Sequence, residues 1–331
     1  MAKRALRAFG GLIAGLAAML VAAHFLGIHP GDVARELTFA SPSMVIGCIA
    51  SAFVVFGLQA LRWHSVMRPI TNLRYVEAYR ALVVGTMFNA LLPARGGDLL
   101  RVQYLGRRTG KSRAKILGTE VVDRWLDWWG WIPVLLVLAI TGSVPKWIFT
   151  ALAAFGGALV AAALGLLLLV HLGRGLQPGS RFANAYRSFR DGALAFVSYR
   201  SLVIAWTIAP LPWLWESLVL RWAGHAFDIH LTLAQAFSVL VGLNLGTFVP
   251  SPGALGSLET AGTAALVLCG ADRTAALAFM FVYHLTQLGP GLVTGVAILI
   301  AEGEFLFGGT RAGVTREGTP GRGGEKEPSA R

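Results

Sequence analysis

Two similar breaks interrupt an otherwise apolar chain, and they restrict its possible folds more than any other feature. Each break starts at an asparagine, passes through proline and glycine, and ends at an acidic residue that begins a new helix. The first break is carried by Asn89, Pro93, Arg95, Gly96, Gly97 and Asp98. The second is carried by Asn244, Pro250, Ser251, Gly253 and Glu259. Broken helices at corresponding positions in two halves of a membrane chain point to a binding site near the bilayer midplane, formed by an inverted repeat.

The composition predicts an all-α polytopic membrane protein. Hydrophobic residues make up 55% of the 331 residues and charged residues 14%, whereas a soluble domain carries about 25% charged residues. Several continuous apolar stretches reach about 18 residues, the length at which a helix crosses about 30 Å of hydrocarbon. A transmembrane barrel would instead need alternating segments of about ten residues.

The formal net charge of +12 fits a membrane topology better than a nucleic-acid partner. The basic residues cluster in loops between apolar segments, as they do in cytoplasmic loops of membrane proteins. Some of them could also hold anionic lipid headgroups. We therefore expect a protein of the bacterial inner membrane with both termini in the cytoplasm, and no nucleic-acid binding.

The apolar segments predict six full transmembrane helices. They lie at about 9–28, 43–61, 119–141, 147–172, 201–223 and 274–301. Pro210 and Pro212 predict a kink in the fifth, and Pro290 predicts a break in the last, because proline removes a helical hydrogen bond. The prediction is a single membrane domain over 1–302 and a disordered cytoplasmic tail over 303–331.

The two broken segments predict helical hairpins at 78–105 and 233–269. The apolar part of the first, 81–93, covers only about 20 Å as a helix, and basic residues flank it on both sides. It therefore reads as a re-entrant hairpin that enters from the cytoplasm. The second forms either a hairpin that enters from outside or two short spans. The total is six spans plus two re-entrant hairpins, or eight spans plus one hairpin.

The breaks are candidates for a polar cavity, since irregular backbone inside a bilayer must contact protein or water. Helix starts present free N–H groups, and Arg95 and Arg101 add positive charge near the first, so this region predicts a phosphate site. Asp98 and Glu259 either line the cavity or cap the helices that they begin.

A second candidate group occupies one face of the helix that follows the first hairpin. Its members, at helical spacing, are Glu120, Asp123, Arg124 and Asp127. A charge at the bilayer centre costs about 2.5–3.5 kcal/mol, so these side chains should face a partner such as Arg101 or Arg95, or water. The alternative is a solvated helix end, which suits Glu120 better than Asp127.

Glu216 is the strongest single candidate, because it lies deep in the span at 201–223. An ionisable residue at that depth indicates a functional site, and the alternative is a protonated acid bonded to a neighbouring helix. His284 and Gln287 of the last span are candidates for the same pocket, with His284 either a packing residue or a proton carrier. No metal, nucleotide or other cofactor site is predicted.

These residues resemble the lysylphosphatidylglycerol synthase transmembrane-region family, also called the flippase-like domain family, over roughly 10–302. The motifs that carry the resemblance are 89–101, 108–112, 123–127, Glu216, 250–259 and 283–284. The family pattern usually has Glu at the positions of Asp98 and Asp123, and often Arg at that of His284. The last departure makes one cavity charge pH-dependent and puts anion binding there in doubt.

The resemblance implies a stand-alone flippase-like protein that moves a lipid or lipid-linked headgroup, either a phospholipid or a polyprenyl-linked lipid. We do not expect an enzyme, because the sequence contains no soluble aminoacyltransferase domain. The alternatives are an integral membrane transferase acting on lipid-linked substrates and a non-catalytic partner of a lipid-synthesis enzyme.

Overall fold

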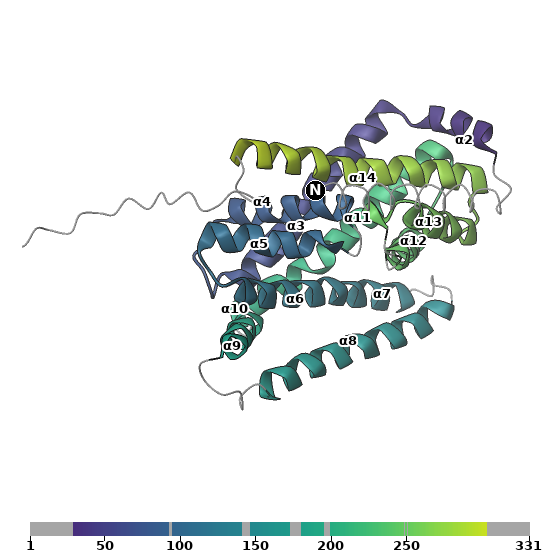
Figure 1. Ribbon diagram of the computed structural model, residues 1–331. Helices are drawn as coiled ribbons and strands as arrows, with labels where there is room; N and C mark the ends of the chain where they lie inside the picture. The colour runs from purple at the N-terminus through teal and green to yellow at the C-terminus, as the bar shows by residue number, and fades with distance from the viewer. Residues whose placement is uncertain are drawn as a thin grey trace, which may run out of the picture.

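The fold was analysed in a computed structural model that describes residues 29–92, 95–140, 146–172, 180–194, 199–247, 249 and 251–302. In these ranges the regular structure is entirely helical, which confirms the predicted all-α class (Figure 1). Three helices in the described part are long and apolar enough to cross a membrane, namely Pro42–Met67, Arg200–Phe227 and Arg273–Glu302. The predicted span at 9–28 and the tail at 303–331 lie outside the described residues. The count of six or eight spans stays a prediction.

The first half of the chain forms a long helix, a hairpin and a following helix. These are α3 (Pro42–Met67), the hairpin arms α4 (Tyr75–Leu91) and α5 (Gly97–Thr109), and α6 (Arg113–Trp129). A short α2 (Pro30–Glu36) and η1 (Leu37–Phe39) precede them. The hairpin arms approach closely, because a Cβ atom on Gly97 would overlap the carbonyl oxygen of Gly85. Only glycine fits at this start of α5.

The second half repeats this order of elements. The long helix is α10 (Tyr199–Ile208) with α11 (Pro210–Gly224), the arms are α12 (Leu233–Gly246) and α13 (Ser257–Leu268), and the following helix is α14 (Arg273–Glu302). The turns η5 (His225–Phe227) and η6 (Pro252–Ala254) complete it. Pro210 stands at the first turn of α11, where its missing N–H costs nothing, so the boundary with α10 falls where the prolines predict an interruption.

The hairpin arms of the second half pack as tightly as those of the first. A Cβ atom on Gly246 would lie 2.7 Å from the carbonyl oxygen of Ser257, and one on Gly242 would lie 2.8 Å from the Cβ of Ala265. Both breaks therefore connect paired antiparallel arms. Their direction of entry into a membrane stays a prediction.

The predicted break of the last span at Pro290 is wrong, because α14 continues through this residue to Glu302. Close packing on α4 explains the continuity. A Cβ atom on Gly291 would lie 2.9 Å from Cγ2 of Thr86, and one on Gly295 would lie 2.5 Å from the Cβ of Met87. Figure 1 shows α14 lying along α4. This packing offsets the hydrogen bond that proline removes.

Three further helices contact α6. They are α7 (Trp131–Ile140), α8 (Lys146–Leu172) and α9 (Arg181–Leu194). Helix α9 crosses α6 at two glycines, since a Cβ atom on Gly192 would overlap the carbonyl oxygen of Lys115 and one on Gly118 would overlap that of Phe189. Helix α8 lies at the edge of the molecule in Figure 1 and contacts α6 and α7.

The tips of the two hairpins meet inside the fold. A Cβ atom on Gly253, in the second break, would lie 3.2 Å from the carbonyl oxygen of Ala90 near the end of α4. Residues more than 150 positions apart thus form one junction, and the space beside it is the candidate site.

Candidate functional site

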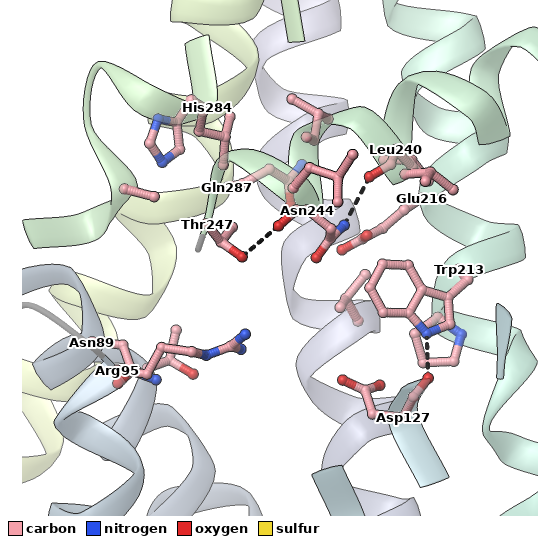
Figure 2. Close-up of a pocket in the computed structure, with 18 of the residues that line it drawn as sticks. Asn89, Arg95, Asp127, Trp213, Glu216, Leu240, Asn244, Thr247, His284 and Gln287 are labelled. Atoms are coloured by element: carbon pink, nitrogen blue, oxygen red, sulfur yellow. Dashed lines mark hydrogen bonds between the residues drawn. The ribbon is translucent and has the colours of Figure 1, made fainter. Parts of the chain in front are cut away.

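A cavity of about 680 Å³ opens beside this junction (Figure 2). Its wall combines residues of both hairpins with residues of α3, α6, α7, α8, α11 and α14. The predicted site residues that line it are Asn89, Arg95, Arg124, Asp127, Glu216, Asn244, Ser251, Gly253, His284 and Gln287. The predicted site residues that do not line it are Gly96, Gly97, Asp98, Arg101, Glu120, Asp123 and Glu259. Pro93 and Pro250 lie outside the described residues.

Behind the wall, a network of ion pairs joins α3, α5 and α6. Arg62 Nε lies 2.8 Å from Asp123 Oδ1, and Arg62 Nη1 lies 2.5 Å from Asp127 Oδ1. Arg101 Nη2 lies 3.2 Å from Asp123 Oδ2 and also pairs with Glu120. All five side chains are buried, so each charge depends on its partners for compensation.

Arg124 connects this network to the first hairpin. Its guanidinium lies 3.1 Å from Glu120 Oε1, 3.3 Å from Asp98 Oδ1 and 3.7 Å from Asp127 Oδ2. Asp98 also accepts a hydrogen bond of 3.0 Å from the side-chain amide of Asn89. The acids on this face of α6 are thus paired and buried and do not form a solvated helix end.

Arg62 is a site residue that the sequence did not predict, because the predicted second span ends at residue 61. Helix α3 continues to Met67, which puts Arg62 inside the bundle with no exposed surface. One signal in the sequence could have found it, because the acids at Glu120, Asp123 and Asp127 require more cations than Arg101 and Arg124 supply.

Arg95 is the most loosely held of the cationic groups on the wall. Its only ion pair among the described residues is with Asp98 at 3.9 Å, and its side chain is 49% exposed. Figure 2 shows the guanidinium pointing into the cavity. Its φ of 54° lies in the left-handed region, which costs about 1–2 kcal/mol for a residue with a Cβ atom. Strained backbone conformations of this kind occur mostly at functional sites, which agrees with the position of Arg95 on the cavity wall.

Glu259 acts as a helix cap and as an ion partner at the same time. One carboxylate oxygen accepts a hydrogen bond of 2.7 Å from the backbone N–H of Gly256, and the other lies 2.8 Å from Nδ1 of His284. Glu259 is buried, and His284 stands between it and the cavity. Of the two alternatives for this acid, the structure shows the helix cap, and Glu259 itself does not line the cavity.

Glu216 faces the cavity from α11. Among the described residues, none forms a hydrogen bond or ion pair with its carboxylate, and Asp127 is its charged neighbour. Figure 2 shows Glu216 and Asp127 on one side of the cavity and Arg95 on the other. The cavity thus has two carboxyl groups on one side and the guanidinium of Arg95 on the other.

Further polar atoms on the wall have no partner within the described part of the chain. They are the side-chain oxygen of Asn89 and the side-chain nitrogen of Gln287, both buried. Leaving such atoms unpaired costs about 1–3 kcal/mol each. The remaining wall is largely apolar and includes Trp128, Trp131 and Ala158.

The fold and the cavity define a helical membrane protein with a cavity, lined by charged and polar residues, between two helical hairpins. The chain belongs to the lysylphosphatidylglycerol synthase transmembrane-region family, whose model matches residues 8–295. This confirms the resemblance seen in the sequence. A UPF0104 membrane protein of Methanothermobacter thermautotrophicus is 30% identical over 153 residues, which cover 44% of this chain and 45% of that protein. The chain therefore matches less than half the length of this relative.

Proposed function

We propose that this protein translocates a phospholipid or another lipid-linked headgroup across the membrane through the cavity between the hairpins. The observation that carries the proposal is the arrangement of charge in one cavity, with Arg95 on one side and Glu216 and Asp127 on the other. A headgroup that crosses hydrocarbon alone loses its hydration, at a cost of many kcal/mol for a full charge. A cavity with complementary charges removes most of that cost.

The basic side suits the phosphate. Arg95 lacks a close partner and can offer its fork of N–H donors to two phosphate oxygens. Arg124 lies on the same wall but is engaged by three carboxylates. Arg101 is buried behind the wall in its own ion pairs, so we assign it to the network that holds α5 against α6.

The acidic side suits a cationic part of the headgroup, such as an amine. Asp127 is already bonded to Arg62, whereas Glu216 has no such partner in the described residues. Glu216 is therefore the carboxylate free to accept N–H donors. The apolar wall would contact the acyl chains, which need no hydrogen bonds.

We place the protein in a bacterial inner membrane with both ends in the cytoplasm. The sequence predicts no nucleotide site, so the movement would be passive or driven by an ion. Its substrate would be a phospholipid or polyprenyl-linked lipid, and a lipid-synthesis enzyme would supply it.

The test is lipid movement in proteoliposomes that contain phosphatidylethanolamine with a fluorescent acyl chain. Dithionite bleaches only the outer leaflet, so continued bleaching reports translocation. We expect Arg95→Ala and Glu216→Gln to slow it about tenfold or more, because a hydrogen bond to a charged group contributes about 1.5–3 kcal/mol. Arg35→Ala is the matched control, since that side chain is 74% exposed and distant from the cavity wall. Unchanged rates in both cavity variants would remove these residues from the proposal.

The shared cavity of Asp127 and Glu216 also supports a second candidate, an integral membrane transferase with paired carboxylates. Its test is turnover of a radiolabelled lipid donor by the purified protein. Product formation that Asp127→Asn abolishes, in a variant that still folds, would favour this candidate over translocation.

A further inference from the structure

The two hairpins carry equivalent acid–base pairs. In the first half, Asp98 in the first turn of α5 bonds to Arg124 on the following helix, at 3.3 Å and a sequence separation of 26. In the second half, Glu259 in the first turn of α13 bonds to His284 on the following helix, at 2.8 Å and a separation of 25. Each acid begins the second arm of its hairpin. Both pairs therefore occupy the same position in a repeated helix–hairpin–helix unit.

Both bases of these pairs border the same cavity. Arg124 and His284 line it, while Asp98 and Glu259 lie behind them. The pairs differ in one chemical property. A guanidinium is always charged in a protein, whereas an imidazole changes its charge between about pH 5 and 8. The second half thus holds a proton-exchanging base where the first holds a fixed charge.

The geometry also identifies the nitrogen that exchanges the proton. Nδ1 of His284 lies 2.8 Å from Glu259 Oε1, and the ionised form of that carboxylate can only accept a hydrogen bond from an Nδ1–H there. Glu259 is held in place by the backbone N–H of Gly256. The Nε2 atom remains to take up a proton from the cavity.

We propose that His284 is a proton-binding site of this cavity and that binding of a lipid phosphate is coupled to proton uptake there. The inference rests on the proposed function. Glu259 of α13 contacts His284 directly. The titratable or charged groups that line the same cavity are Glu216 of α11, Asp127 and Arg124 of α6, Arg95 of the first break and Tyr283 of α14.

The direction of the coupling follows from these charges. Arg95 and Arg124 line the same cavity as His284 and carry fixed positive charges. A phosphate that binds Arg95 compensates part of this positive charge and adds negative charge of its own, so it favours the protonated form. By reciprocity, a proton on His284 then favours phosphate binding by the same factor. A proton gradient across the membrane would give the lipid movement a direction.

The experiment measures proton uptake during lipid binding and does not depend on translocation. Short-chain phosphatidylethanolamine is titrated into the detergent-solubilised protein by calorimetry, in buffers of different ionisation enthalpy, at about pH 5.5, 6.5 and 7.5. We expect the wild type to take up a proton fraction that varies with pH, and its affinity to fall about tenfold or less between the lowest and highest pH.

Two variants at His284 decide the outcome. His284→Arg carries the fixed charge of its counterpart Arg124, and His284→Gln keeps a hydrogen bond to Glu259 without a titratable ring, so at least one should fold. Both should bind lipid without pH-dependent proton uptake. His230→Gln is the matched control, because that ring is 64% exposed in a loop and should leave the uptake unchanged.

The possible results separate the two proposals. Lipid binding by the wild type without proton uptake, or uptake that persists in both His284 variants, overturns the proton site and leaves translocation standing. Proton uptake with binding but no movement in proteoliposomes supports the site and contradicts translocation. A wild type that does not bind this lipid contradicts both.

Discussion

Gly253 touches the backbone of Ala90, with a Cβ position 3.2 Å from its carbonyl oxygen, so the two hairpin tips are in direct contact. Gly253 also has a φ of 60°, which costs a residue with a side chain about 1–2 kcal/mol. We expect Gly253→Val to separate the tips and slow translocation about tenfold or more, because small displacements of binding groups cost large factors in rate. Proteoliposome assays would measure the rate.

Gly110 offers the matched control for this variant. Its φ of 66° is nearly the same, but nothing lies within 4 Å of its Cβ position. Gly110→Val therefore has the same free-energy cost of a left-handed backbone conformation but leaves the contact between the two hairpin tips unchanged. Equal translocation rates in the two variants would show that the tip contact has no functional role.

Arg62 should matter for stability more than for substrate contact. It is buried between Asp123 and Asp127, and its removal leaves both acids short of a cation. We expect Arg62→Gln to lower the free energy of unfolding by about 3–5 kcal/mol, the usual effect of breaking a buried ion pair. Thermal unfolding in detergent would show it as a lower midpoint.

Arg62→Lys refines this test. Lysine keeps the charge but loses the fork of donors that reaches both acids, so an intermediate loss is expected. The exposed Arg35→Gln should change stability by no more than about 0.5 kcal/mol. A loss in Arg62→Gln as small as that of Arg35→Gln would contradict the buried network.

The sequence predicted the elements whose signals are local. Proline and glycine mark both breaks, and the helical spacing of Glu120, Asp123 and Asp127 predicted a face that needs partners. The depth of Glu216 in an apolar span predicted a polar pocket. Each of these features depends on neighbours within a few turns of helix, which a single sequence displays directly.

The parts that escaped prediction depend on contacts between distant segments. Arg62 seemed to follow a span because hydropathy falls there, but packing extends α3 past it. Pro290 seemed to end a helix, but the glycines after it let α14 press against α4. The pairing of Glu259 with His284 joins residues 25 apart across a hairpin arm, a distance that no helical period specifies.

The crossing of α9 over α6 predicts a large effect from one methyl group. A Cβ atom on Gly192 would overlap the carbonyl oxygen of Lys115, which is backbone and cannot rotate away. We expect Gly192→Ala to destabilise the protein by about 1–3 kcal/mol, as overpacking does. The measurement is the unfolding midpoint in detergent.

For Gly165 in α8 we expect the same glycine-to-alanine substitution to have the opposite effect on stability. Nothing lies within 4 Å of its Cβ position, so Gly165→Ala should stabilise the helix by about 0.5–1 kcal/mol. The two variants should move the midpoint in opposite directions. A midpoint that Gly192→Ala leaves unchanged or raises would mean that α9 does not cross α6 at this glycine.

Glu302, at the end of α14, forms an ion pair with Arg108 of the first hairpin, and a double-mutant cycle should detect this interaction. Its Oε1 lies 2.8 Å from Arg108 Nη1, and both side chains are mostly buried. We expect Glu302→Gln and Arg108→Gln to couple by about 0.5–1.5 kcal/mol in thermal unfolding. The more exposed pair Arg190 and Asp191 should couple by less than about 0.5 kcal/mol. Additive losses at Glu302 and Arg108 would instead mean that this ion pair does not help to hold α14 against the first hairpin.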